Sequence, residues 1–209
     1  MKSSLPPPDD CSPEAVAALH ARVRELQTQL LDERRMSRTD YLTGLMNLRG
    51  MEETLLRMAA TCMRERKPLS VIFLDLQGFK QINDTYGQPT GDHVLRHVGK
   101  VLGAVYTGDT DSLSVLRPLD AAARVGGDEF VVLLPGADFE VTRRVAQRLE
   151  FVLGEKEFVA LNTPFWGLGI HRGIGTIISR EDLKNPIASL YQPVAAAMSA
   201  NKRIKKSQQ

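Results

Sequence analysis

The chain has 209 residues, of which 43% are hydrophobic and 25% are charged, and its formal net charge is +2. This composition is typical of one globular domain with an extension, and it excludes collagen-like and largely disordered proteins. The tail 201–209 holds four basic residues and no acid, so the rest of the chain carries a net charge of −2. We therefore expect no surface for DNA or RNA, although the tail could contact a phosphate ligand.

The two cysteines, Cys11 and Cys62, lie far apart and form no CxxC pair, which favours free thiols in a reducing compartment. No apolar stretch reaches the roughly 18 residues of a membrane span. The first residues also lack the apolar segment of a secretory signal peptide. We expect a cytoplasmic protein without a membrane span.

The N-terminal region is expected to be a disordered segment, residues 1–12, followed by a helical, coiled-coil-like linker over residues 13–39. Ser12 and Pro13 are typical of a helix start. The apolar residues then recur at steps of three and four, as in a heptad seam: Val16, Leu19, Val23, Leu26 and Leu30. Two interpretations stay open, namely a parallel dimer through this helix and a helix packed on its own domain.

The remaining elements are expected from hydrophobic period and from Gly and Pro punctuation. A helix over 48–66 precedes a buried strand, Leu69–Leu76, because that strand is a continuous apolar run. Further helices are expected over 79–84, 91–106, 140–153 and 187–204, and Pro193 should break or kink the first half of the last of these.

Strands are expected on either side of a tight turn, over 121–125 and 129–134, because Gly126 and Gly127 can supply a positive φ. Two more strands are expected within 157–178, separated by 164–167. This element order indicates an α+β fold, a mixed sheet flanked by helices.

Three acids are expected at one end of this sheet. Asp75 ends the apolar strand, and Asp128 and Glu129 lie at the tip of the glycine turn. Carboxylates from two adjacent strands could bind Mg²⁺, which prefers oxygen ligands and substrate phosphates. A solvated β-turn is the alternative.

The chain resembles the GGDEF family, the diguanylate cyclases, in three motifs. Residues 124–130 read RVGGDEF, and residues 40–47 read DYLTGLMN, similar to the family's DxLTGLxN. Residues 75–87 read DLQGFKQINDTYG and are followed by Gly91-Asp92, similar to DxDxFKxINDxxGHxxGD. The resemblance covers about residues 40–206, the expected GGDEF domain.

The resemblance implies a sheet like the palm of nucleotidyl cyclases and polymerases. It implies an enzyme that condenses two GTP into cyclic di-GMP with release of pyrophosphate, as a homodimer in which each subunit holds one GTP. Mg²⁺ or Mn²⁺ would be the cofactor. By position, Asp75, the carbonyl of Leu76, Asp128 and Glu129 would bind the metal, and Asp128, assisted by Glu129, would be catalytic.

The resemblance also implies the substrate contacts. Asn83 and Asp92 would bind the guanine, because a carboxylate and an amide match its N1, N2 and O6 groups. The phosphates would lie against backbone amides and two lysines of the closing helix: Gly78, Phe79, Lys80, Lys202 and Lys206. A solvated basic tail is the alternative for the two lysines.

Arg117 and Asp120 resemble the family's RxxD site, at which the product inhibits the enzyme. Departures from the family pattern are Gln77, Gln88 and Gly173, an insertion at about 107–116, and a closing helix that lacks the usual Asp and Tyr. These changes leave a second hypothesis open, a catalytically weak or inactive module that acts as a receptor for cyclic di-GMP or GTP.

Overall fold

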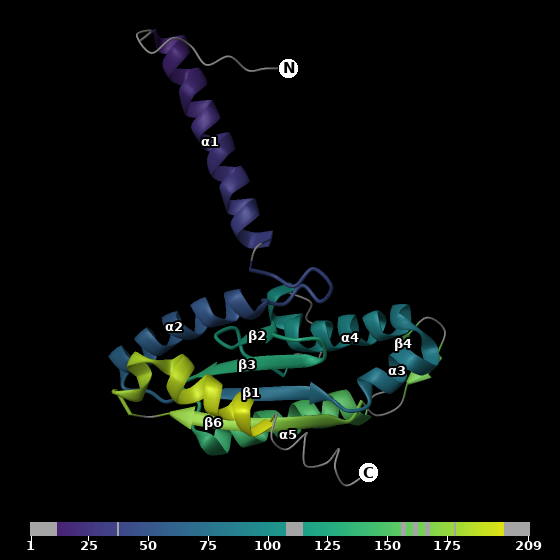
Figure 1. Cartoon of the computed structure of the whole chain (residues 1–209). Coiled ribbons are helices and arrows are strands. Elements are labelled where there is room, and N and C mark those ends of the chain that lie inside the picture. Colours follow the sequence, from purple (N-terminus) through teal and green to yellow (C-terminus); the bar gives the residue numbers. More distant parts are fainter. Residues whose placement is uncertain are drawn as a thin grey trace. The chain divides into compact units, whose positions relative to one another are not determined.

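The structure is a computed structural model that describes residues 12–36, 38–107, 115–155, 158–160, 163–165, 168–177 and 179–198 (Figure 1). The chain divides into two compact units, residues 1–37 and residues 38–209. The expected disorder of residues 1–12 and the expected insertion at 107–116 fall largely outside the described residues. Within the described residues, no helix has both the length and the apolar character that a membrane crossing requires.

The described residues of the first unit form one long helix, α1 (Pro13–Met36). Ser12 caps it as expected, since its Oγ accepts a hydrogen bond from the backbone N–H of Ala15 at 3.1 Å. Four apolar side chains of the heptad positions are 43–49% exposed: Val16, Leu19, Val23 and Leu26.

A four-stranded sheet forms the centre of the second unit, in the order β2-β3-β1-β6. The strands are β1 (Leu69–Leu76), β2 (Ala121–Arg124), β3 (Glu129–Pro135) and β6 (Ile170–Ile177). All three strand pairings are antiparallel, and the isolated bridge between Met46 and Ala123 is parallel.

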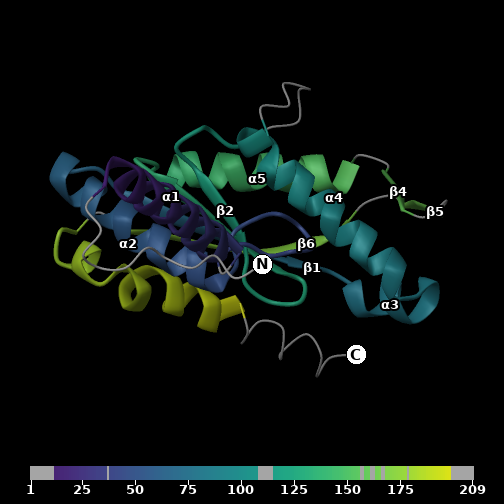
Figure 2. The ribbon, with the colours of Figure 1, turned by 90° about the horizontal axis from the view of Figure 1, so that it is seen from above.

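Helices cover both faces of this sheet (Figure 2). One face packs against α4 (Gln88–Thr107) and α5 (Phe139–Glu155). The other face packs against α2 (Leu48–Glu65) and the closing helical segment, which includes a short 3-10 turn, η1 (Asp182–Lys184). Because both faces are covered, all eight residues of β1 are buried. The helix α3 (Phe79–Tyr86) follows β1 and lies beside α4.

The α+β, palm-like class is confirmed, but the central sheet is antiparallel and not mixed, and some local expectations were wrong. The segment expected to hold two strands holds three, because β4 (Phe158–Ala160) and β5 (Thr163–Phe165) form a separate hairpin before β6. Pro164, expected between two strands, lies inside β5. Each strand of a two-stranded hairpin has one unpaired edge, and a proline on such a strand need not cost a hydrogen bond between the strands.

Two backbone features correct or extend the sequence-based picture. Neither Gly126 nor Gly127 has a positive φ, so the β2–β3 turn does not need glycine for that reason. The expected kink before Pro193 is a π-helical turn, η2 (Ile187–Tyr191), in which the N–H of Gln192 bonds to the carbonyl of Ile187. Residues 192–198 then continue as a helix.

Candidate active site

Two of the expected acids meet at the end of β1. Asp75 is paired directly with Glu129 on β3, and directly opposed residues of an antiparallel pair carry their side chains on the same face. Asp75 is only 5% exposed. The third acid is tied to the same place, because the N–H of Leu76 donates to the carbonyl of Asp128 at 3.2 Å. The turn that carries Asp128 is therefore fastened to the end of β1.

The first glycine of the turn makes room for Glu129. A Cβ placed on Gly126 would lie 2.6 Å from Oε2 of Glu129, whereas a Cβ on Gly127 would meet nothing within 4 Å. The carboxylate of Glu129 thus lies against the backbone of Gly126. Any larger residue at position 126 would displace the Glu129 carboxylate, so glycine serves this close approach and not a positive φ.

An ion pair that the sequence did not predict supports the turn. Arg124 Nη1 lies 3.2 Å from both carboxylate oxygens of Asp40, and its Nη2 donates to the carbonyl of Gly127 at 2.8 Å. Burial raises the pKa of Asp40, but hydrogen bonds from Thr43 and the nearby Arg124 charge outweigh it and lower the pKa overall. The opposite charges at the starts of two separate motifs were the only sequence signal for this pair.

The donor set at this edge fits a hard divalent cation. Asp75, Asp128 and Glu129 offer carboxylate oxygens, and Leu76 offers a carbonyl. Within the part of the chain that the structure describes, no three His, Cys, Asp or Glu side chains lie close enough together to form a ready metal cluster. Mg²⁺ commonly uses one or two carboxylates and completes its shell with water and substrate phosphates, so the residues fit this ion.

The two expected guanine-binding residues come from neighbouring helices. Asn83 on α3 is packed against Gly91 of α4, where a Cβ would overlap its Oδ1, and this buried oxygen has no hydrogen-bond partner among the described residues. Asp92 on α4 is half-buried and lines a shallow hollow of about 300 Å³. The residues that line this hollow do not include Asn83.

The loop expected to receive the phosphates is open on one side. Gly78 has φ +69° at the start of α3, and a Cβ there would meet nothing within 4 Å. The backbone of Phe79 and Lys80 follows in the first turn of α3. Lys202 and Lys206 lie outside the described residues.

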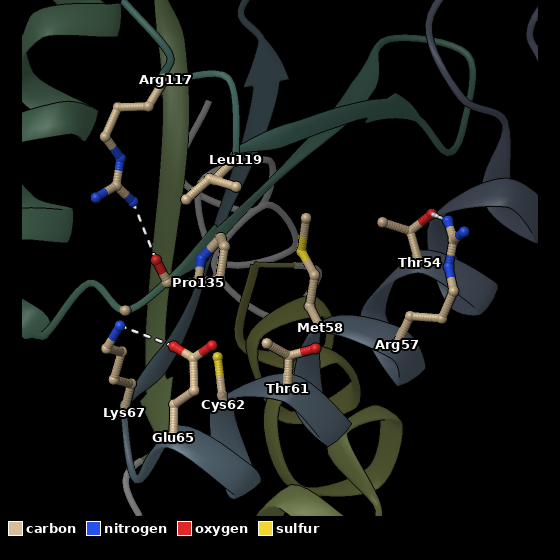
Figure 3. A pocket seen from close by; sticks show the side chains of 11 residues that line it. Thr54, Arg57, Met58, Thr61, Cys62, Glu65, Lys67, Arg117, Leu119 and Pro135 are labelled. Carbon is tan, nitrogen blue, oxygen red and sulfur yellow. Dashed lines mark hydrogen bonds and ion pairs between the residues drawn. The ribbon is translucent and has the colours of Figure 1, made fainter.

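Arg117 and Asp120 bind each other. The guanidinium donates to Asp120 at 2.7–3.1 Å, the backbone N–H of Arg117 donates to Oδ2 at 2.8 Å, and the Asp120 side chain is 1% exposed. The hydrogen bond with Asp120 raises the pKa of Arg117. Arg117 also donates to the carbonyl of Pro135 at 3.1 Å (Figure 3).

The other side of Arg117 borders a cavity of about 530 Å³ between α2 and the end of β3 (Figure 3). Arg57, Met58 and the free, buried thiol of Cys62 line it from α2. Burial raises the pKa of that thiol. The exposed Leu119 closes the rim beside Arg117.

Comparisons with known proteins point to one family. A family model described as "Diguanylate cyclase, GGDEF domain" matches residues 37–208. Diguanylate cyclase DgcP of Pseudomonas aeruginosa is 34% identical over 145 residues, which make up 69% of this chain and 20% of that protein. Diguanylate cyclase DosC of Escherichia coli K12 is 37% identical over 123 residues, 59% of this chain and 25% of that protein. The chain therefore spans a quarter or less of these two relatives.

A solved structure agrees with the fold. The coiled coil and GGDEF domain of DgcB from Caulobacter crescentus, in complex with c-di-GMP, matches with a TM-score of 0.73 at 27% identity. The match covers 90% of this chain and 92% of that one.

Proposed function

The chain belongs to the GGDEF family, and on that basis we propose that it is a diguanylate cyclase that condenses two GTP into cyclic di-GMP. The observation that carries this proposal is the pairing of Asp75 with Glu129 beside the turn that holds Asp128. Asp75 lies opposite Glu129, and the Asp128 carbonyl is bonded to the end of β1. The relatives named as diguanylate cyclases support the same reaction.

In the proposed reaction, the 3′-oxygen of one GTP bonds to the α-phosphorus of the other. The bond to the β-phosphate oxygen breaks, and pyrophosphate leaves. The 3′-oxygen of the second GTP then bonds to the α-phosphorus of the first, which releases the second pyrophosphate and closes the ring. Asp128 accepts the proton of the attacking hydroxyl, and Glu129 assists.

Asp75, Asp128, Glu129 and the carbonyl of Leu76 would hold Mg²⁺ or Mn²⁺. The bound ion would neutralise phosphate charge and make the hydroxyl easier to deprotonate. The chain's own groups position the substrate. Asp92 accepts hydrogen bonds from N1 and N2 of guanine, which adenine cannot supply in the same pattern, and Asn83 serves another position on the base.

Phosphate binding relies on the loop after β1. The amides of Gly78, Phe79 and Lys80 donate to phosphate oxygens near the positive end of α3. Lys202 and Lys206 are proposed to add two positive charges from the closing helix. Binding at fixed positions is the main contribution of the protein, because phosphoryl transfer needs little covalent help.

Two subunits are needed, because each holds one GTP. We assign the pairing to α1, which carries Val at positions 16 and 23 and Leu at positions 19 and 26. Alternation of β-branched and Leu residues favours parallel two-stranded coiled coils. The row of half-exposed side chains on α1 gives a second helix an apolar seam to cover.

Product inhibition is proposed at Arg117 and Asp120. Arg117 is half-exposed at the rim of the cavity beside α2, where its guanidinium can bind a phosphate or a guanine edge. Asp120 already accepts hydrogen bonds from Arg117. A guanine that bound Asp120 would have to displace that arginine first.

A receptor without turnover is the second candidate. It is favoured by Gln88 and by the closing helix, which lacks the family's usual acid and tyrosine. Such a protein would bind GTP or cyclic di-GMP and signal to a partner.

Product formation by the purified dimer separates the two candidates. Wild type with GTP and Mg²⁺ should yield cyclic di-GMP, Asp128→Ala should yield none, and the exposed Asp182→Ala should match wild type. Circular dichroism checks that both variants are folded. A dimeric wild type that binds cyclic di-GMP but makes none would select the receptor.

A further inference from the structure

The loop after β1 is hydrogen-bonded to the start of β6 through one residue, Gln77. Its backbone N–H donates to the carbonyl of Gly169 at 2.8 Å. Its Nε2 donates to the carbonyl of Ile170 at 3.2 Å and lies 3.1 Å from Nδ1 of His171. One residue thus contacts three consecutive positions where β6 begins.

The Gln77 side chain is exposed on one side and lies against Gly169 on the other. A Cβ on Gly169 would lie 2.8 Å from Oε1 of Gln77 and 3.2 Å from its Cβ, so a larger residue there would displace the Gln77 side chain. The bond to Ile170 fixes which end of the amide is the donor. The second N–H of this amide then points to Nδ1 of His171.

His171 brings this contact next to the candidate active site. It is paired with Asp75 in the β1–β6 register, on the side of β1 opposite to Glu129. Directly opposed residues share a face, so His171, Asp75 and Glu129 form a row across three strands. The Gln77–His171 contact is therefore at the edge of the row of acids.

We propose that Gln77 is a positioning residue, which holds the carbonyl of Leu76 and the amides of residues 78–80 where the triphosphate and its cation bind. This inference rests on the proposed function. Gln77 stands between these groups in the chain, and Gly78 is otherwise open, with nothing within 4 Å of a Cβ position. The family pattern has an aspartate at this position, and an ionised carboxylate could not donate a hydrogen bond to the carbonyl of Ile170.

The test compares Gln77→Met, which keeps the size of the side chain but removes its amide, with Gln81→Met on the exposed side of α3. Hydrogen exchange of the amides of residues 77–80 is measured without nucleotide or metal. Affinity for a non-hydrolysable GTP analogue with Mg²⁺ is measured by calorimetry. Gln77→Met should speed exchange and weaken the analogue roughly tenfold, and Gln81→Met should do neither.

A second variant separates positioning from bulk stability. Gln77→Glu keeps the shape but replaces the donor by an acceptor, so it should weaken the analogue at least as much as Gln77→Met. The proposal is overturned if either Gln77 variant binds like wild type, or if Gln77→Met lowers only the melting temperature. Absence of cyclic di-GMP from the wild type would remove the proposed reaction, whereas exchange and analogue binding would still decide the role of Gln77.

Discussion

Arg124 and Asp40 form an ion pair between residues 84 positions apart, with side chains that are only 14% and 16% exposed. The pair joins the segment before α2 to the β2–β3 turn. The same segment also bonds to β2 through its backbone, since the N–H of Arg124 donates to the carbonyl of Met46 at 2.8 Å. The segment before α2 thus supports the turn that carries Asp128 from outside the sheet.

Removing this ion pair should lower both stability and product formation. Arg124→Met leaves the Asp40 carboxylate without its cation and frees the carbonyl of Gly127, so we expect a loss of about 1–3 kcal/mol in the free energy of unfolding. Urea unfolding measures the loss. Arg49→Met, which removes an exposed pair with Glu53, should cost less than about 1 kcal/mol. Equal losses for the two variants would contradict a special role for Arg124.

The same pair predicts a dependence of stability on pH. The pKa of Asp40 is lowered in the folded chain from its ordinary value of 3.8, so its contribution is present above that value and is lost as pH falls through the folded pKa. Asp40→Asn should therefore destabilise the chain at pH 7 and reduce the loss of stability below about pH 4. The melting temperatures of wild type and Asp40→Asn, measured between pH 3 and 7, should approach each other as pH falls. Melting temperatures that stay equally far apart at every pH would exclude this role of Asp40.

The two turn glycines should differ in their effect on metal binding. Gly126→Ala pushes the carboxylate of Glu129 away, because the new Cβ would lie 2.6 Å from its Oε2, and we expect Mn²⁺ affinity to fall several-fold. Gly127→Ala meets no atom within 4 Å and should leave Mn²⁺ affinity unchanged. Titration with Mn²⁺ in the absence of nucleotide measures both. An Mn²⁺ affinity that is unchanged in Gly126→Ala would contradict the role of Glu129 as a metal ligand.

The closing helix should depend on a contact between Met198 and Gly173, a residue at which the chain departs from the family pattern. A Cβ on Gly173 would lie 2.8 Å from Cγ of Met198, so the glycine of β6 makes room for this methionine. Gly173→Ser alone should cost about 1–3 kcal/mol. Gly173→Ser should cost less in a Met198→Ala background than in wild type, which a double-mutant cycle of unfolding free energies would detect. Additive losses would mean that the two sites are independent.

Much of the fold could be predicted because its signals are local. The apolar run of β1 and the periodic residues of α2 and α5 gave element types and bounds within a few residues. The β4–β5 hairpin was missed because its two strands are three residues each, too short for a periodic signal.

The site was predictable only in part, since its supporting contacts join residues far apart in the chain. Motifs marked Asp75, Asp128 and Glu129, but the partners of Arg124 and Gln77 come from other motifs or from β6. The reason for glycine at the turn was also misjudged. Its φ is ordinary, and the space it leaves for a carboxylate depends on side-chain packing that no local pattern encodes.

The most direct test of the central claim is the stoichiometry of the reaction. Purified, dimeric protein is incubated with GTP and Mg²⁺, and cyclic di-GMP and pyrophosphate are quantified by liquid chromatography with mass spectrometry. The account predicts two pyrophosphates for each cyclic di-GMP, and neither product when ATP replaces GTP. A dimeric sample that consumes no GTP, or that releases pyrophosphate without cyclic di-GMP, would contradict it.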